Sequence, residues 1–332
     1  MKKVLLVLFI FIISSMKCFA EDIHVAYNID DNYATFAMIS MDSILKHNKS
    51  KSDYTFYILH EENNLSSWNK FQLSTFVLLK GQSIKFLSID KEKFKNIDYS
   101  GSWFARHIAP IAFARIYLVD LLPDSIDKVL YIDADTLVNL DLKTLFDLEL
   151  DESPIAMALD HDYTASKFQK ISSLYCNSGV ILFDTNNWRK LNISKKIFEI
   201  YNNKSYALEF IEQDLLNYAS KGIVKLIDSK YNHQICDYCP RKFDDSYYKE
   251  RLDNTVIHYI SPEKPWTFNK IVSDEDIVYY KFWLKSPLVI YMPYYYFKGE
   301  MFQSKVRPFL RNYIDNVRSH YSRIKTIRKI YF

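Results

Sequence analysis

The chain has 332 residues, 48% of them hydrophobic, and a formal net charge of +3. This length accommodates one large α/β domain with appendages or two modest domains, and the apolar content excludes global disorder. The small net charge indicates no polyanionic partner, and five glycines in the whole chain argue against a glycine-rich phosphate loop.

The first twenty residues have the pattern of a targeting segment. Lys2 and Lys3 precede an apolar run from Val4 to Ile13, and Ser14, Ser15 and a Cys18-Phe19-Ala20 stretch follow. This order is typical of a signal peptide, and the run is too short for an ordinary transmembrane helix. A cleaved signal and an uncleaved anchor both remain open, so residues 1–20 are set apart from the fold.

From residue 23 onward, strand-like apolar runs alternate with segments of helical periodicity. Strands are predicted at 23–28, 54–59, 84–87, 129–132, 154–159, 175–183 and 256–260. Helices are predicted around 37–45 and at 65–80, 107–120, 142–146, 186–201 and 209–220. This alternation predicts an α/β fold with a mainly parallel sheet flanked by helices.

Two carboxylates follow the buried strand at 129–132. In extended backbone, residues i and i+2 point to the same side, so Asp133 and Asp135 can converge on one hard divalent cation. An isolated Asp-x-Asp is more often a solvated turn, so the pair needs support from other residues. Asp30 follows the first predicted strand and is expected at the same edge of the sheet.

Further motifs occur in a fixed order along the chain. They are Val25-Ala26-Tyr27 with Asp30, Asn32 and Tyr33; Asp133-x-Asp135; Asn177-Ser178-Gly179; Gln213-Asp214; and His258-Tyr259 with Lys264-Pro265-Trp266. Together they resemble glycosyltransferase family 8, which includes bacterial lipopolysaccharide glucosyl- and galactosyltransferases and glycogenin. The resemblance covers about residues 22–270. It implies a GT-A fold, in which a Rossmann-like nucleotide-binding half adjoins an acceptor-binding half.

The resemblance also implies transfer of a hexose, glucose or galactose, from a UDP-sugar with retention of configuration and with Mn²⁺ or Mg²⁺ as cofactor. Its metal ligands match Asp133, Asp135 and His258. Its uridine-binding loop matches Asp30, Asn32 and Tyr33, while Lys264 matches the lysine on the diphosphate and Arg115 the arginine near the donor sugar. Candidate catalytic residues are Asn177, Glu212 and Gln213 around the transferred sugar, Asp214 in the same motif, and Asp160 on the acceptor side.

Retention admits two routes. A double displacement needs a carboxylate nucleophile, whereas Gln213 at the family position is a poor one. We therefore favour front-face transfer, in which the departing phosphate oxygen deprotonates the acceptor hydroxyl. Ser261 replaces a usual glycine and Glu212 a common aspartate, which leaves the diphosphate contact and the donor hexose open.

Residues 271–332 are predicted to form a C-terminal helical, basic extension after a catalytic domain at 21–270. Between Met301 and Phe332 there are eight Lys or Arg and one acidic residue. Apolar residues lie there at helical spacing, namely Ile314, Val317, Tyr321, Ile324 and Ile327. Such a helix is typical of an anionic membrane surface, which suits a lipid-linked oligosaccharide or lipopolysaccharide core as acceptor. A solvated helix packed on its own domain is the alternative, and no nucleic-acid-reading module is present.

These features favour a membrane-associated enzyme at the cytoplasmic face of the bacterial inner membrane, where UDP-sugars are expected. Export through the signal-like segment is the alternative location. Two other functions stay open: a glycogenin-like protein that glucosylates its own tyrosines, and a catalytically silent protein that binds nucleotide sugars or membranes. Retention of Asp133, Asp135, His258 and Lys264 argues against the silent protein.

Overall fold

The structure is a computed structural model, and it describes residues 22–94, 110–161, 171–172, 174–203, 208–235, 252–262, 264–267 and 274–295. The signal-like segment and the basic amphipathic tail lie outside the described residues. The chain divides into two compact units, Met1–Ser261 and Pro262–Phe332, whereas the predicted boundary followed residue 270. In the described part of the chain, no helix has the length and apolarity needed to span a bilayer.

A seven-stranded sheet forms the centre of the first unit, in the order β3-β2-β1-β4-β7-β6-β8. Its strands are β1 (Asp22–Asn28), β2 (Asp53–Glu61), β3 (Ser83–Ile89), β4 (Lys128–Ile132), β6 (Ile155–Leu159), β7 (Cys176–Asp184) and β8 (Val224–Leu226). The pairs β1–β2, β2–β3, β1–β4 and β6–β8 are parallel, and β7 is antiparallel to both of its neighbours. The mainly parallel sheet is therefore confirmed, with β7 reversed.

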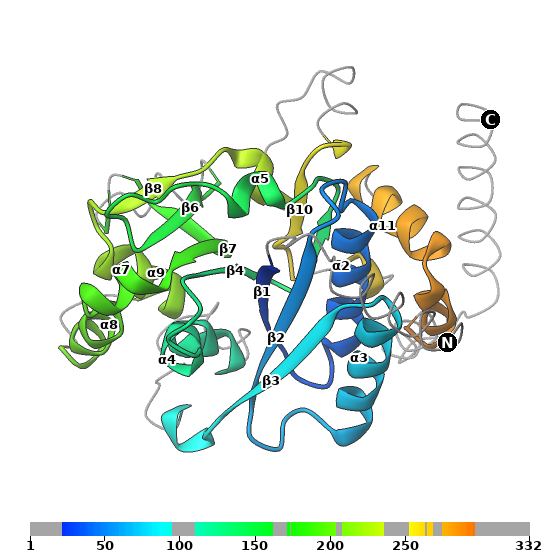
Figure 1. The fold of residues 1–332 in the computed structure, drawn as a ribbon, viewed down its shortest axis with the longest axis horizontal. Coiled ribbons are helices and arrows are strands. Elements are labelled where there is room, and N and C mark those ends of the chain that lie inside the picture. Colours follow the sequence, from blue (N-terminus) through cyan, green and yellow to red (C-terminus); the bar gives the residue numbers. More distant parts are fainter. Residues whose placement is uncertain are drawn as a thin grey trace, which may run out of the picture. The chain divides into compact units, whose positions relative to one another are not determined.

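Helices accompany both halves of this sheet (Figure 1). They are α2 (Ala34–Lys46), α3 (Ser67–Leu79), α4 (Leu118–Leu121), α5 (Lys143–Phe146), α7 (Thr185–Lys190), α8 (Ile193–Asn202) and α9 (Ile211–Ala219). In Figure 1, α2 and α3 lie beside β1–β3, while α7, α8 and α9 group beside β4 and β7.

Two of the predicted helices differ from the structure. The helix predicted at 186–201 is two helices, because Asn192 adopts a left-handed φ of 52° between α7 and α8. Within the segment predicted as a helix at 107–120, the described part is a 3₁₀ helix, Pro110–Tyr117, that runs into α4. The one-helix prediction for 186–201 was wrong, since helical spacing alone does not reveal a positive φ.

A second, three-stranded sheet has the order β5-β10-β9. It comprises β5 (Thr136–Val138), β9 (His233–Ile235) and β10 (Val256–Tyr259). β10 pairs antiparallel with β5, with His258 opposite Thr136, and parallel with β9. Because β5 begins one residue after Asp135, this small sheet connects the Asp-x-Asp segment to the late strand.

The second unit contains η4 (Pro265–Thr267), α11 (Asp274–Lys285) and η5 (Pro287–Tyr291). Trp266 packs against Tyr279, with ring centroids 5.5 Å apart, and the Tyr280 hydroxyl donates to the Pro265 carbonyl at 2.7 Å. Trp266 thus packs within its own unit.

Candidate functional site

The strand directions bring several polar segments to one edge of the large sheet. β1, β4 and β6 run parallel to one another, so Asp30, Asp133 and Asp160, which follow them, lie at the same edge. The reversed strand β7 begins at that edge, which places Asn177 next to the ends of its neighbours. The Asp133 amide accordingly donates to the Gly179 carbonyl at 2.8 Å.

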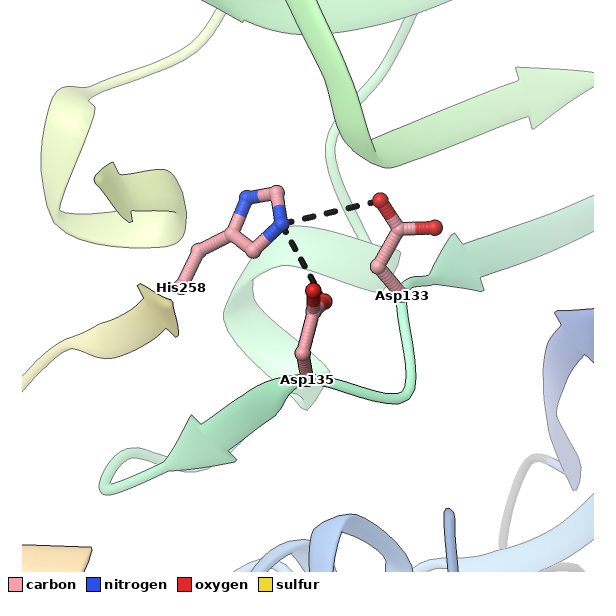
Figure 2. Close-up of side chains that lie close together, drawn as sticks. All are labelled: Asp133, Asp135 and His258. Carbon is pink, nitrogen blue, oxygen red and sulfur yellow. Dashed lines mark ion pairs between the residues drawn. The ribbon is translucent and has the colours of Figure 1, made fainter. Parts of the chain in front are cut away.

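Asp133 and Asp135 converge through a turn rather than through extended backbone, contrary to the argument from strand alternation. The antiparallel pairing of β5 with β10 then delivers His258 to the same point, and the Tyr259 amide donates to the Asp135 carbonyl at 3.0 Å. Figure 2 shows the His258 ring directed at both carboxylates. Its Nε2 lies 3.6 Å from Asp133 Oδ2 and 3.3 Å from Asp135 Oδ1.

A chain of amide hydrogen bonds sets the tautomer of His258. Asp160 can only accept, so Asn177 donates its Nδ2 to Asp160 Oδ2 at 3.3 Å and keeps Oδ1 as an acceptor. Asn232 donates its Nδ2 to that oxygen at 2.8 Å, which turns its own Oδ1 toward His258 Nδ1 at 2.9 Å. Nδ1 therefore carries a proton, and Nε2, which faces Asp133 and Asp135, offers its lone pair in the neutral ring.

This arrangement fits a divalent metal ion. Two carboxylate oxygens and one imidazole nitrogen lie within 4.8 Å of one another. Two carboxylates this close repel each other, so a cation bound among the three groups would be stabilised by them. The Nδ1–Asn232 bond is the support that ligating histidines receive. Oxygen ligands suit Mg²⁺ and Mn²⁺, and the added imidazole favours a transition ion such as Mn²⁺.

Gly179 makes room for the imidazole. A Cβ at this position would lie 2.0 Å from His258 Cε1 and 2.5 Å from its Nδ1. The ring is buried and tied to Asn232, so it cannot move aside without leaving the cluster. The glycine beside the polar pair thus marks a close approach, as a glycine within a strand pattern indicates.

Arg115 contacts the metal-ligand cluster through Asp133. Its guanidinium pairs with Asp133 Oδ1 at 3.0 Å and donates to the Ser178 carbonyl at 2.6 Å. Although burial disfavours its charge, the nearby Asp133 carboxylate keeps the pKa of Arg115 above its ordinary value. The structure therefore places Arg115 against Asp133, where it partly neutralises the cluster and fixes one carboxylate.

Gln213 connects α9 to the start of β7. Its Oε1 accepts from the Ser178 amide at 3.0 Å, and its Nε2 donates to Asp160 Oδ2 at 2.7 Å and to the Tyr175 hydroxyl at 3.1 Å. Asn177 donates to the same Asp160 oxygen. Three of the predicted site residues, Asp160, Asn177 and Gln213, thus form one hydrogen-bonded group.

Asp214 and Glu212 flank Gln213 on α9. The Asp214 carboxylate is fully buried and accepts from the Tyr175 hydroxyl and from the Glu209 and Phe210 amides. Burial raises its pKa to about 6, against the effect of these three donors. Burial also raises the pKa of Glu212, which the Arg115 guanidinium opposes. Asp214 therefore anchors the first turn of α9, and its predicted catalytic role stays a prediction.

The Asp30 loop forms a compact turn after β1. Asp30 Oδ1 accepts from the Asn32 and Tyr33 amides at 2.9 and 3.1 Å. Burial and the charges of Asp135, Asp30 and Asp133 raise the pKa of Tyr33. Lys264 belongs to the second unit, and its contact with the diphosphate stays a prediction.

Comparison with known proteins identifies the family. A model described as glycosyl transferase family 8 matches residues 24–270. The chain belongs to glycosyltransferase family 8. It is 30% identical over 259 residues to a lipopolysaccharide 1,2-glucosyltransferase of Escherichia coli, covering 74% of each protein. It is 26% identical over 257 residues to a lipopolysaccharide 1,3-galactosyltransferase of Salmonella typhimurium, again covering 74% of each.

A solved structure of the galactosyltransferase LgtC with donor and acceptor sugar analogues is 25% identical, with a TM-score of 0.65. The match covers 79% of this chain and 94% of that one. The predicted family and GT-A fold are confirmed. The motifs did not reveal Asn232, which hydrogen-bonds to His258 and Asn177, or Tyr175, which hydrogen-bonds to Gln213 and Asp214. Asn232 immediately precedes β9, a strand of three residues that gave no periodic signal.

Proposed function

We propose that this family 8 member transfers glucose or galactose from a UDP-sugar to a lipopolysaccharide or lipid-linked oligosaccharide core, with retention of configuration. The observation that carries the proposal is the cluster of Asp133, Asp135 and His258. Asn232 binds Nδ1 of His258, so that Nε2 of this ring is directed at the two carboxylates. The named activities of the E. coli and Salmonella relatives support the acceptor class.

Mn²⁺, or Mg²⁺ in its place, would be held by Asp133, Asp135 and His258 and would supply Lewis-acid stabilisation to the diphosphate leaving group. Arg115 keeps the Asp133 carboxylate oriented, since its guanidinium holds Oδ1 at 3.0 Å. Lys264 is proposed as a further positive charge on the diphosphate, and the Asp30–Tyr33 loop as the contact for uridine.

On the sugar side, Asp160, Asn177 and Gln213 form a preorganised polar surface for the hexose hydroxyls. The carboxamide of Gln213 is a poor nucleophile, and its hydrogen bonds to Ser178 and Asp160 hold it in place as a polar contact. We therefore infer front-face transfer, in which the leaving phosphate oxygen takes the acceptor proton. Trapping of a glycosyl adduct on Glu212 or Asp214 would overturn this route.

The test is release of UDP from UDP-glucose and UDP-galactose with Mn²⁺, with and without a truncated lipopolysaccharide acceptor. We expect acceptor-dependent UDP release that is lost in Asp135→Ala, and proton NMR of the product should show the anomeric configuration of the donor. No turnover with any UDP-sugar would contradict the proposal. Growth of the protein's own mass in hexose steps would instead indicate self-glucosylation.

A further inference from the structure

The side chain of Gln234 joins the two sheets at the edge that carries the site. Gln234 is the middle residue of β9, and its backbone pairs with His258 in the small sheet. Its Oε1 accepts from the His161 amide at 3.0 Å, and its Nε2 donates to the Leu159 carbonyl at 3.0 Å. The carboxamide of Gln234 therefore binds the backbone on both sides of Asp160.

This contact continues the large sheet beyond the end of β8. The pairing of β6 with β8 ends at Met157 and Leu226, after which the Ile227 amide donates to the Met157 carbonyl at 3.1 Å. In a parallel pair, a residue binds the carbonyl before its partner and the amide after it. Gln234 binds these same two groups around Asp160, so its side-chain amide takes the place of a peptide group of a neighbouring strand.

Asp160 is also held from the other side. Its amide donates to the Tyr175 carbonyl at 3.0 Å. Its Oδ2 accepts from Gln213 at 2.7 Å and from Asn177 at 3.3 Å. The hydrogen bonds to Gln234 complete this set, so Asp160 is fixed in its backbone as well as in its side chain.

A second amide of the same segment connects the metal ligands to the sugar side. Asn232, two residues before Gln234, binds His258 Nδ1 at 2.9 Å and donates to Asn177 Oδ1 at 2.8 Å. β9 itself has three residues, so its ladder with β10 is short. The side chains of Asn232 and Gln234 extend its contacts to the large sheet, one toward Asn177 and the other toward the backbone around Asp160.

We propose that Gln234 is a positioning residue for the transfer reaction. It holds Asp160 at a fixed place relative to the strand of the metal ligand His258, and so aligns the acceptor with the donor sugar. The inference rests on the proposed function, in which Asp160 belongs to the polar surface beside the sugar and is assigned to the acceptor side. Because reacting groups must be closely aligned, a small displacement of Asp160 is expected to cost a large factor in rate.

The expected effect of Gln234→Ala is confined to the acceptor. The Asp160 carboxylate keeps its two amide donors, but the backbone that carries it loses two hydrogen bonds. We expect kcat/KM for a truncated lipopolysaccharide acceptor to fall about tenfold. KM for the UDP-sugar and the affinity for Mn²⁺ should stay near their wild-type values, because the metal cluster keeps its ligands.

Gln82→Ala is the matched control. Gln82 also binds backbone with both ends of its carboxamide, since it accepts from the Tyr54 amide at 2.6 Å and donates to the Lys80 carbonyl at 3.4 Å. It does so where β2 begins, at the opposite end of the strands from the site. We expect Gln82→Ala to leave the acceptor kcat/KM unchanged. An equal loss in Gln82→Ala and Gln234→Ala would overturn the proposal.

A double-mutant cycle shows whether Gln234 acts through Asp160. Asp160→Asn keeps an oxygen for the two amide donors but removes the charge, and it should lower the acceptor kcat/KM by itself. Adding Gln234→Ala to Asp160→Asn should then cost much less than adding it to the wild type. Additive losses would overturn the proposal, because Gln234 would then act independently of Asp160.

Hydrogen exchange measures the contact without turnover. The His161 amide donates to Gln234, so its exchange should become at least about tenfold faster in Gln234→Ala and stay unchanged in Gln82→Ala. Unchanged exchange in Gln234→Ala would overturn the proposal whether or not the chain is active. Failure of the wild type to turn over any UDP-sugar would contradict the proposed function instead, and the exchange result would still decide whether Gln234 holds the segment around Asp160.

Discussion

The two sides of the site satisfy their charges differently. On the sugar side, amides, a tyrosine hydroxyl and backbone N–H groups donate to Asp160 and Asp214. On the metal side, Asp133 and Asp135 face Nε2 of His258, and the Arg115 guanidinium pairs with Asp133. The hydrogen-bonded side therefore holds its carboxylates with neutral donors, whereas the carboxylates of the cluster converge in a geometry that fits a bound cation.

The largest expected effect comes from removing a cluster ligand. Asp135→Ala and His258→Ala should each abolish measurable Mn²⁺ binding and lower transfer activity by at least about 10²-fold, because the leaving group loses its charge stabilisation. Titration followed by Mn²⁺ electron paramagnetic resonance measures the first effect. Asn139→Ala, which removes a hydrogen bond to the Leu252 carbonyl near β10, is the control. Tight Mn²⁺ binding by both ligand variants would place the metal elsewhere.

Gly179→Ala tests the same cluster without removing a ligand. The added methyl group would overlap the His258 ring, so the imidazole must leave its place or β7 must shift. We expect loss of Mn²⁺ affinity close to that of His258→Ala, together with a lower melting temperature in calorimetry. Unchanged affinity would mean that His258 coordinates from another position.

Asn232→Ala should weaken Mn²⁺ binding by roughly 10- to 100-fold, the usual cost of losing the partner behind a ligating histidine. Asn232→Asp keeps an acceptor for His258 Nδ1 but sets a carboxylate oxygen against Asn177 Oδ1, so part of the metal affinity should return. This rescue separates tautomer control from general structural damage. Equal losses in the two variants would contradict that role.

Asp214→Asn addresses the hydrogen-bonded side and has the smallest expected effect. The folded-state pKa of about 6 exceeds the unfolded value near 3.9, so Asp214 contributes more stability below pH 4 than above pH 6. The free-energy difference between wild type and variant should therefore fall by about 2 kcal/mol from pH 4 to pH 7. Urea unfolding across that range measures it, and a difference that rises with pH would contradict burial as the cause.

Much of the fold follows from local patterns. β1, β2 and β4 are rich in β-branched and aromatic residues and were predicted within one or two residues. β5, β8 and β9 have three residues each, too few to show a period, and the reversal of β7 depends on its neighbours rather than on its own residues. The strand directions, which decide what meets at the site edge, come from tertiary pairing.

The residues of the site also divide into those that local sequence predicts and those that depend on tertiary pairing. Asp30 and Asp133 were expected at one edge because both follow parallel strands, and the structure places them there. His258 was assigned by family resemblance, since its approach depends on the pairing of β5 with β10. Asn232 was not predicted, because a buried amide in a short connection has no sequence signature.

Gly179 also has a consequence for sequence variation within the family. Every replacement adds at least one carbon at a point already occupied by the His258 ring, so the two positions are not free to vary independently. A side chain at 179 becomes compatible with the cluster only when a shorter ligand replaces His258. The effects of substitutions at the two positions are therefore expected to be strongly non-additive, and the pair should change together among related sequences.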